Sequence, residues 1–194
     1  SLKCQLIDME KNERIMKGHY DRIGGSRSSL RFNVRGEKTV IEHPARDFEE
    51  AISEILSLLV SDKYKVINSF EEIGAVGHRI VHGGEKFKES VIIDEKVIEA
   101  IKECITLAPL HNPAGLAGIE ACKKLLPNVP MVAVFDTSFH QTMPEKAFIY
   151  QLPYKYYEDY KIRKYGFHGI SHRYVANRIS EMTGKKDLKV INCH

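Results

Sequence analysis

The chain has 194 residues, of which 43% are hydrophobic, enough to build an ordinary globular core and to exclude a disordered protein. Lysine and arginine number 29 and aspartate and glutamate 26, a difference of three, and both signs are interspersed along the chain. This balance gives no indication of binding to nucleic acid or to a membrane surface. No apolar run approaches the roughly 18 residues of a membrane span, and no segment has the pattern of a leader.

The cysteines indicate a reducing compartment. They are widely spaced, with no C-x-x-C pair and no dense framework of the kind that small secreted domains need. We therefore expect a cytoplasmic protein. The four residues are Cys4, Cys104, Cys122 and Cys193.

The first third of the chain predicts β-strands. Cys4 to Asp8, Ser29 to Val34 and Lys38 to Glu42 have the composition of strands. Turn signals separate them at Gly24-Gly25-Ser26 and at Gly36-Glu37. This order predicts an antiparallel meander.

Four later segments have the pattern of helices. Between Asp47 and Val60, apolar residues recur at the i, i+3, i+4 and i+7 spacing of one helix face. Asp94 is the expected N-cap of a helix from Glu95 to Ile105. An Asn-Pro pair opens a helix from Asn112 to about Leu126, and Ser171 to Met182 is also expected to be helical.

Two strands are expected among these helices. They are Ala75 to Val81 and the wholly apolar Met131 to Phe135, whose lack of alternation predicts burial on both faces. A meander followed by alternating helices and strands predicts an α/β domain with a mixed sheet. Because ligands of such sheets bind beyond the carboxyl ends of strands, the residues after each apolar run are the candidates for chemistry.

Both ends of the sequence suggest a longer polypeptide. The first residue is Ser1 rather than Met, and Leu2 to Met9 already has the pattern of a strand. Leu188 to Ile191 is apolar and β-branched, so a strand is expected three residues before His194. We therefore expect the chain to be a fragment.

Arg79 is the first candidate site residue. An expected strand leads into it, and it lies among His78, His82, Gly83 and Gly84. Its planar guanidinium suits a carboxylate or phosphate bound through two hydrogen bonds, and glycines allow the backbone to approach a ligand closely. A structural salt bridge beside a tight turn is the alternative, and the spacing does not decide between the two.

Asp136 follows the apolar run Met131 to Phe135 directly. A carboxylate at the rim of a buried strand is costly unless it has a partner. The functional hypotheses are a metal ligand, direct or through water, and a general base. The structural alternative is that its carboxylate bonds to the amides of Thr137 and Ser138.

His168 lies in a Gly-Phe-His-Gly segment just ahead of the helix expected from Ser171. Its imidazole and the nearby amides could bind an anion together. His168 and His172 also form an H-x-x-x-H pair, and a zinc-dependent hydrolase that uses the histidines is the second class of function considered. The zinc motif lacks the glutamate that should follow the first histidine, so this class is less favoured.

The stretch from Tyr150 to Tyr165 is rich in tyrosine and basic residues. Such a stretch resembles a stacking surface for single-stranded nucleic acid, but the near-neutral charge of the chain favours a surface for domain packing or for a protein partner. A non-catalytic interaction domain that uses Tyr156 and Tyr157 is therefore the third class.

The chain closely resembles the acetate kinases, enzymes that move a phosphoryl group between ATP and acetate. The resemblance runs from Ser1 to His194 and is most specific in four blocks that read G-H-R-I-V-H-G-G, A-P-L-H-N-P, V-F-D-T-S-F-H and Y-G-F-H-G. In chain order, the blocks are Gly77 to Gly84, Ala108 to Pro113, Val134 to His140 and Tyr165 to Gly169.

The resemblance implies a ribonuclease H-like α/β fold, with a mixed five-stranded sheet and flanking helices. This is the first domain of the superfamily of acetate and sugar kinases, heat-shock chaperone ATPases and actin. Residues 1–194 would form the amino-terminal domain, without the first strand and phosphate loop of the family and without its carboxy-terminal nucleotide-binding domain. We therefore expect this polypeptide to be inactive alone.

The resemblance also implies roles for single residues. In the family, the arginine that matches Arg79 holds the acetate carboxylate, the aspartate that matches Asp136 is catalytic, and the histidine that matches His168 steadies the transferring phosphoryl group. The acetate methyl is held by residues that match Val81, Leu110 and Phe167. The ATP phosphates lie near positions that match Lys3 and His194.

The expected chemistry follows from the charge of acetate. Acetate is a carboxylic acid comparable to aspartate, whose reference pKa is about 3.9, so it is ionised at neutral pH and needs no base. Asp136 is then better interpreted as the organiser of a metal-bound water. Arg79, His168 and Mg²⁺ would then stabilise charge on the phosphoryl oxygens. ATP, ADP, acetate and acetyl phosphate are the implied small molecules, and the family is usually homodimeric. Propionate remains an alternative substrate, because one methylene changes binding by only about 1 to 3 kcal/mol.

Overall fold

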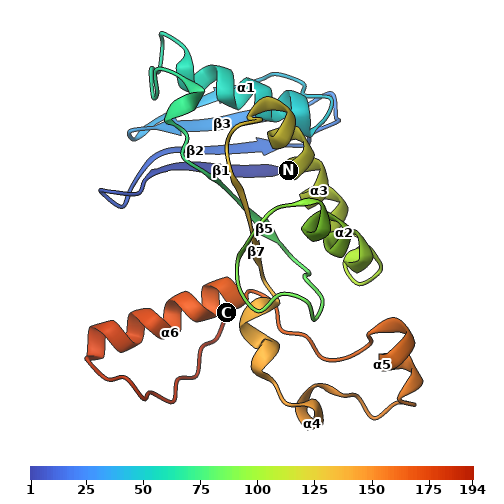
Figure 1. Cartoon of the computed structure of the whole chain (residues 1–194). Coiled ribbons are helices and arrows are strands. Elements are labelled where there is room, and N and C mark those ends of the chain that lie inside the picture. The colour runs from blue at the N-terminus through green and yellow to red at the C-terminus, as the bar shows by residue number, and fades with distance from the viewer. The chain divides into compact units, whose positions relative to one another are not determined.

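A computed structural model describes all 194 residues, which form two compact units (Figure 1). The first unit contains Ser1–Gly74 and Ala117–Val129. The second contains Ala75–Leu116 and Pro130–His194. None of the helices is both long enough and apolar enough to cross a membrane.

A four-stranded antiparallel sheet forms the centre of the first unit, with its strands in chain order. The predicted meander is therefore confirmed, although one of its strands was not predicted. That strand is β2, in which charged and small residues interrupt the apolar alternation. The strands are β1 (Leu2–Asp8), β2 (Glu13–Asp21), β3 (Ser29–Val34) and β4 (Glu37–Ile41).

One face of this sheet is buried under the helix α1 (Phe48–Val60), which lies across it in Figure 1. Tyr20 and Phe32, on neighbouring strands, are almost completely buried. Gly18 on β2 pairs directly with Phe32, and a side chain there would meet the Sγ atom of Cys4 at 2.7 Å. The side chain of Asp47 caps α1 by accepting a hydrogen bond from the Glu50 amide.

The second unit is built on a three-stranded mixed sheet. Its central strand is β7, which pairs in parallel with β5 and antiparallel with β6. The mixed sheet and the strand predicted at 131–135 are thus confirmed. The five strands expected in a single sheet are instead distributed over a four-stranded and a three-stranded sheet, because β1 to β4 pair only with one another. The strands are β5 (Val76–Ile80), β6 (Val91–Ile92) and β7 (Met131–Phe135).

Helices and 3₁₀ turns make up the remaining elements. The helix α3 begins in the second unit and ends in the first. The α-helices are α2 (Glu95–Glu103), α3 (Asn112–Leu125), α4 (Glu145–Phe148), α5 (Lys155–Tyr160) and α6 (Gly169–Thr183). The 3₁₀ turns are η1 (Phe70–Glu72), η2 (Cys104–Thr106) and η3 (Ser138–Thr142).

Two predictions about elements need correction. The helix expected to reach Ile105 ends at Glu103 and tightens into η2. The strand expected at Leu188 to Ile191 does not form, and the segment has no regular secondary structure. Apolar, β-branched residues become a strand only when a neighbouring strand accepts their backbone hydrogen bonds, and neither sheet provides one here.

Candidate active site

The parallel pairing of β5 with β7 places Arg79 beside Asp136. The register aligns Ile80 with Phe135, and the amide of Asp136 donates to the carbonyl of Ile80 at 3.0 Å. The Arg79 guanidinium then binds the Asp136 carboxylate through two hydrogen bonds. Its Nε atom donates to Oδ1 at 3.0 Å, and its Nη2 atom donates to Oδ2 at 2.7 Å.

The two partners of this ion pair differ in exposure. Asp136 is buried, with 2% of its side chain exposed, whereas 60% of the Arg79 side chain is exposed. The hydrogen bond to Asp136 raises the pKa of Arg79 above its usual value. A guanidinium has five N–H donors, and Asp136 takes two of them. The ion pair predicted as an alternative for Arg79 is thus confirmed, and it leaves donors on the exposed side for an anionic ligand.

The structure does not support the interpretation that the carboxylate of Asp136 bonds to the amides that follow it. The hydroxyl of Thr137 instead accepts a hydrogen bond from the Gly83 amide at 3.1 Å, and that of Ser138 donates to the Phe135 carbonyl at 3.0 Å. The residues after Asp136 therefore fix the backbone of the strand ends. The carboxylate itself is left to Arg79.

The Gly-Phe-His-Gly segment packs directly on this strand end. The amide of Gly169 donates to the carbonyl of Asp136 at 2.9 Å. A side chain at Gly169 would collide with that same carbonyl and would lie 2.8 Å from the Cβ atom of Phe139. Glycine is therefore required at this position, and the close approach brings His168 to the rim that holds Asp136.

His168 has an unusual backbone conformation. It is the N-cap of α6, with φ 53° and ψ 24°, and its side chain makes no capping hydrogen bond. A residue other than glycine in this left-handed region costs about 1 to 2 kcal/mol. Strain of this kind is concentrated at functional sites. The exposed imidazole of His168 and the amides of Ile170 and Ser171 at the start of α6 are thus available to an anion.

Several histidine rings lie close to one another at the start of α6. The rings of His168 and His194 are 4.6 Å apart, and the His172 ring is 5.7 Å from that of His194 and 5.6 Å from that of His140. His140 also contacts the Phe167 carbonyl through Nε2 at 3.3 Å. Nowhere do three or more metal-ligating side chains take an arrangement that could hold a metal ion.

The three residues predicted to hold a methyl group are accessible. Val81 is half-buried, Phe167 is 41% exposed and Leu110 is 86% exposed. Among the residues that match the ATP-binding positions, His194 lies beside His168, whereas Lys3 is an exposed residue of β1 in the first unit. Their roles stay predictions.

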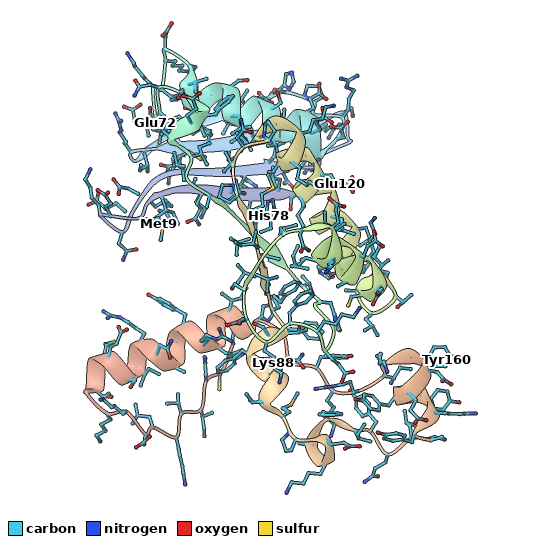
Figure 2. All side chains as sticks on the ribbon, in the orientation of Figure 1. Met9, Glu72, His78, Lys88, Glu120 and Tyr160 are labelled. Carbon is cyan, nitrogen blue, oxygen red and sulfur yellow. The ribbon has the colours of Figure 1, made fainter.

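Sequence reasoning missed a buried polar pair beneath this region. His82 and Asn112 are 1% and 0% exposed, and the Asn112 side chain binds both the amide and the carbonyl of His82. The sequence predicted Asn112 only as the start of a helix, yet a buried asparagine needs partners for its side-chain oxygen and nitrogen. Burial lowers the pKa of His82 to about 4. It has the same effect on His78 of β5, whose side chain is labelled in Figure 2 and whose pKa is also lowered to about 4.

The tyrosine-rich stretch contributes to packing in the second unit. Arg163 is buried, stacks 3.6 Å from the ring centre of Phe148 and donates to Glu85 at 2.6 Å. Tyr157 also donates to Glu85, at 3.0 Å. This supports the domain-packing interpretation for part of the stretch, while Tyr156 and other residues remain exposed.

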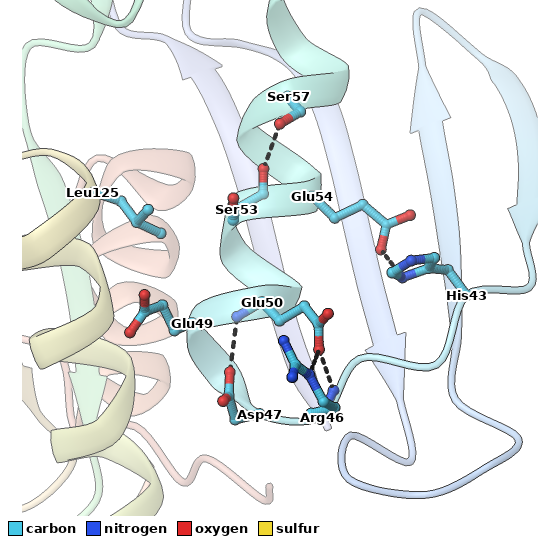
Figure 3. A pocket seen from close by; sticks show the side chains of 9 residues that line it. All are labelled: His43, Arg46, Asp47, Glu49, Glu50, Ser53, Glu54, Ser57 and Leu125. Carbon is cyan, nitrogen blue, oxygen red and sulfur yellow. Dashed lines mark hydrogen bonds and ion pairs between the residues drawn. The ribbon is translucent and has the colours of Figure 1, made fainter.

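An open pocket of about 510 Å³ lies in the first unit and contains none of the predicted site residues (Figure 3). Four of its polar side chains form two pairs with one another. Arg46 binds Glu50, and His43 binds Glu54 at 3.0 Å. We therefore interpret this pocket as a shallow surface region beside α1 and not as a ligand site. It is lined by His43, Arg46, Asp47, Glu49, Glu50, Ser53, Glu54, Ser57 and Leu125.

Comparisons with known proteins agree with the resemblance. The family model of the acetokinase family matches residues 1–194. The acetate kinases of Acetivibrio thermocellus and Thermotoga maritima are each 59% identical to the chain over its full length, which corresponds to 49% of theirs. The chain thus spans about half the length of the curated relatives it matches.

Solved structures give the same result. The acetate kinase of Porphyromonas gingivalis superposes with a TM-score of 0.90 and 49% identity, over 95% of this chain and 46% of that one. A propionate kinase of Francisella tularensis superposes with a TM-score of 0.88 and 37% identity, over 95% and 47%. These likenesses confirm the predicted α/β fold class, and the chain belongs to the acetokinase family.

Proposed function

We propose that the chain carries the carboxylate-binding half of an acetate kinase, which transfers a phosphoryl group reversibly from ATP to acetate and yields acetyl phosphate and ADP. The observation that carries this proposal is the pairing of Arg79 with Asp136 at the carboxyl ends of two parallel strands. An arginine held along one edge and exposed along the other presents oriented donors to a carboxylate.

The proposed substrate contacts follow from the arrangement around this pair. The acetate carboxylate binds the free N–H donors of Arg79, and Val81, Leu110 and Phe167 surround the methyl group. His168 and the uncapped amides of α6 stabilise negative charge on the transferring phosphoryl group. Lys3 and His194 act near the ATP phosphates. Acetate is already ionised at neutral pH, so no residue of the chain needs to remove a proton from it.

Asp136 has a different role in this proposal from the one that the sequence suggested. Both of its carboxylate oxygens accept hydrogen bonds from Arg79, and only 2% of the side chain is exposed. A direct bond from this carboxylate to Mg²⁺ does not fit that packing. Asp136 therefore serves to orient Arg79. Its interaction with Mg²⁺ through a bound water stays a prediction, and Mg²⁺ is proposed as the ion that accompanies ATP.

Propionate is the second candidate substrate, because a propionate kinase shares the fold of this chain at a TM-score of 0.88. A full-length kinase that carries this chain tests both. Acyl phosphate formation, measured as the hydroxamate, should proceed with higher kcat/KM on acetate than on propionate. Arg79→Ala should reduce turnover as well as acetate affinity. Unchanged turnover of this variant at saturating acetate would contradict the role of Arg79.

The full-length enzyme is further proposed to act as a cytoplasmic homodimer. The 194-residue chain alone lacks about half the length of its curated relatives. We expect it to form no acyl phosphate in the same assay, and a near-normal rate would refute this expectation. Light scattering of the full-length protein would measure the oligomeric state.

A further inference from the structure

A buried pair of polar side chains joins three segments of the second unit. The Oδ1 atom of Asn112 accepts a hydrogen bond from the His82 amide at 3.2 Å. Its Nδ2 atom donates to the carbonyls of His82 at 2.9 Å and Ile101 at 3.1 Å. Because Asn112 is fully buried and its amide makes three hydrogen bonds, the backbone of His82 is held in one position.

The ring of His82 is fixed as well. Its Nδ1 atom accepts a hydrogen bond from the Gly84 amide at 3.0 Å, which places the proton of the neutral imidazole on Nε2. Burial lowers the pKa of His82 to about 4, so the ring is uncharged at neutral pH. It packs edge to face against Tyr165 and Phe167, with ring centres 4.4 and 5.6 Å away.

This arrangement connects the three residues proposed to hold the alkyl group of the substrate. Val81 immediately precedes His82, and Leu110 lies two residues before Asn112. Phe167 is in direct ring contact with His82. A change in the volume of the His82 side chain should therefore move Phe167 relative to the segments that carry Val81 and Leu110.

We propose that His82, held by Asn112, is a specificity-determining positioning residue that sets the length of the carboxylate alkyl chain accepted by this site. The inference rests on the proposed function, because it assumes that a short carboxylate binds at Arg79. His82 does not touch the substrate in this account. It acts through Phe167, whose ring it supports.

Two substitutions at this position separate the proposal from a merely structural role. In His82→Asn, the side-chain oxygen takes the place of Nδ1 and still accepts from Gly84, but the ring that supports Phe167 is lost. In His82→Phe, a larger ring replaces the imidazole. The first variant should enlarge the alkyl site and the second should reduce it.

The measurement is the ratio of kcat/KM for propionate to that for acetate, in the full-length kinase that carries this chain. We expect the ratio to rise about tenfold in His82→Asn and to fall in His82→Phe, since one methylene in an apolar pocket is worth about 10- to 200-fold. His43→Asn, which changes a histidine of the first unit, is the matched control and should leave the ratio unchanged.

The outcomes are distinct. An unchanged ratio, or a shift of both variants in the same direction, would overturn the proposal, because a general loosening of the site moves both variants alike. If His82→Asn does not fold, His82→Phe decides alone, and a ratio that fails to fall overturns the proposal. A parent enzyme that phosphorylates neither carboxylate would instead contradict the proposed function.

Discussion

Each unit contains an arginine paired with a carboxylate, and two such pairs, one from each unit, differ in sequence separation and in the burial of the carboxylate. Arg46 and Glu50 are four residues apart at the start of α1, and their side chains are 84% and 29% exposed. Arg79 and Asp136 are 57 residues apart and join two strand ends, with exposures of 60% and 2%. The first pair forms because its residues are one helical turn apart, whereas the second forms only when β5 and β7 pair in the sheet.

The difference identifies the pair that is prepared for a ligand. An exposed pair at i, i+4 supports the helix that carries it and is worth at most a few tenths of a kcal/mol. A buried carboxylate that holds one edge of an arginine keeps the other edge oriented toward solvent before any ligand arrives. Such preorganisation is what a site for an anion needs.

The largest expected effect comes from removing the buried charge. Asp136→Asn retains the shape of the side chain, but its amide nitrogen cannot accept from Arg79. The guanidinium then loses its orientation, and we expect turnover on acetate in the full-length kinase to fall by about 10²- to 10³-fold.

Glu50→Gln is the matched control for Asp136→Asn, because it neutralises the carboxylate of the other pair. It should leave kcat and KM unchanged. Equal losses of turnover in the two variants would contradict the inference that only the Arg79–Asp136 pair is oriented for a ligand.

A second comparison concerns pH. The folded chain holds His82 with a pKa of about 4, below the usual value of 6.5, so the unfolded state binds a proton that the folded state does not bind. The contribution of His82 to the free energy of unfolding should therefore be constant above pH 6.5, fall as the pH drops from 6.5 to 4, and lose up to about 3 kcal/mol over that window.

Unfolding of the 194-residue chain by denaturant at a series of pH values measures this dependence. His82→Asn should flatten the slope between pH 6.5 and 4. The variant leaves His78 to titrate with its own lowered pKa, so part of the slope persists. A slope that is identical with and without His82 contradicts its burial as a neutral ring.

Most of the secondary structure could be predicted, because its causes are local. The apolar run at 131–135 forms β7, and Asp94 caps α2, because of residues adjacent in the sequence. The pairing of Arg79 with Asp136 could not be predicted, since it depends on the register between two strands 55 residues apart. The buried His82–Asn112 pair was missed for the same reason, since its partners lie 30 residues apart.

Two glycines test how closely the segment before α6 must approach the strand end. A methyl group at Gly169 would collide with the Asp136 carbonyl, whereas one at Gly118 on α3 meets no atom within 4 Å. Gly169→Ala should destabilise the chain by about 1 to 3 kcal/mol, and Gly118→Ala should stabilise it by about 0.5 to 1 kcal/mol. Denaturant unfolding measures both. A Gly169→Ala variant as stable as its parent would mean that the contact is looser than described.

The smallest expected effect on stability concerns the residues that precede α1 and α6. Asp47 caps α1 by accepting from the Glu50 amide at 2.8 Å, whereas His168 precedes α6 in a left-handed conformation and caps nothing with its side chain. Asp47→Ala should cost about 1 kcal/mol of stability and leave acetate turnover unchanged.

His168→Asn should leave stability unchanged and reduce acetate turnover, because asparagine tolerates the left-handed region but cannot replace the imidazole at the phosphoryl group. Unfolding curves and the hydroxamate assay on both variants complete the comparison. If His168→Asn keeps full turnover, the strained start of α6 is a feature of folding alone, and the anion must be held elsewhere.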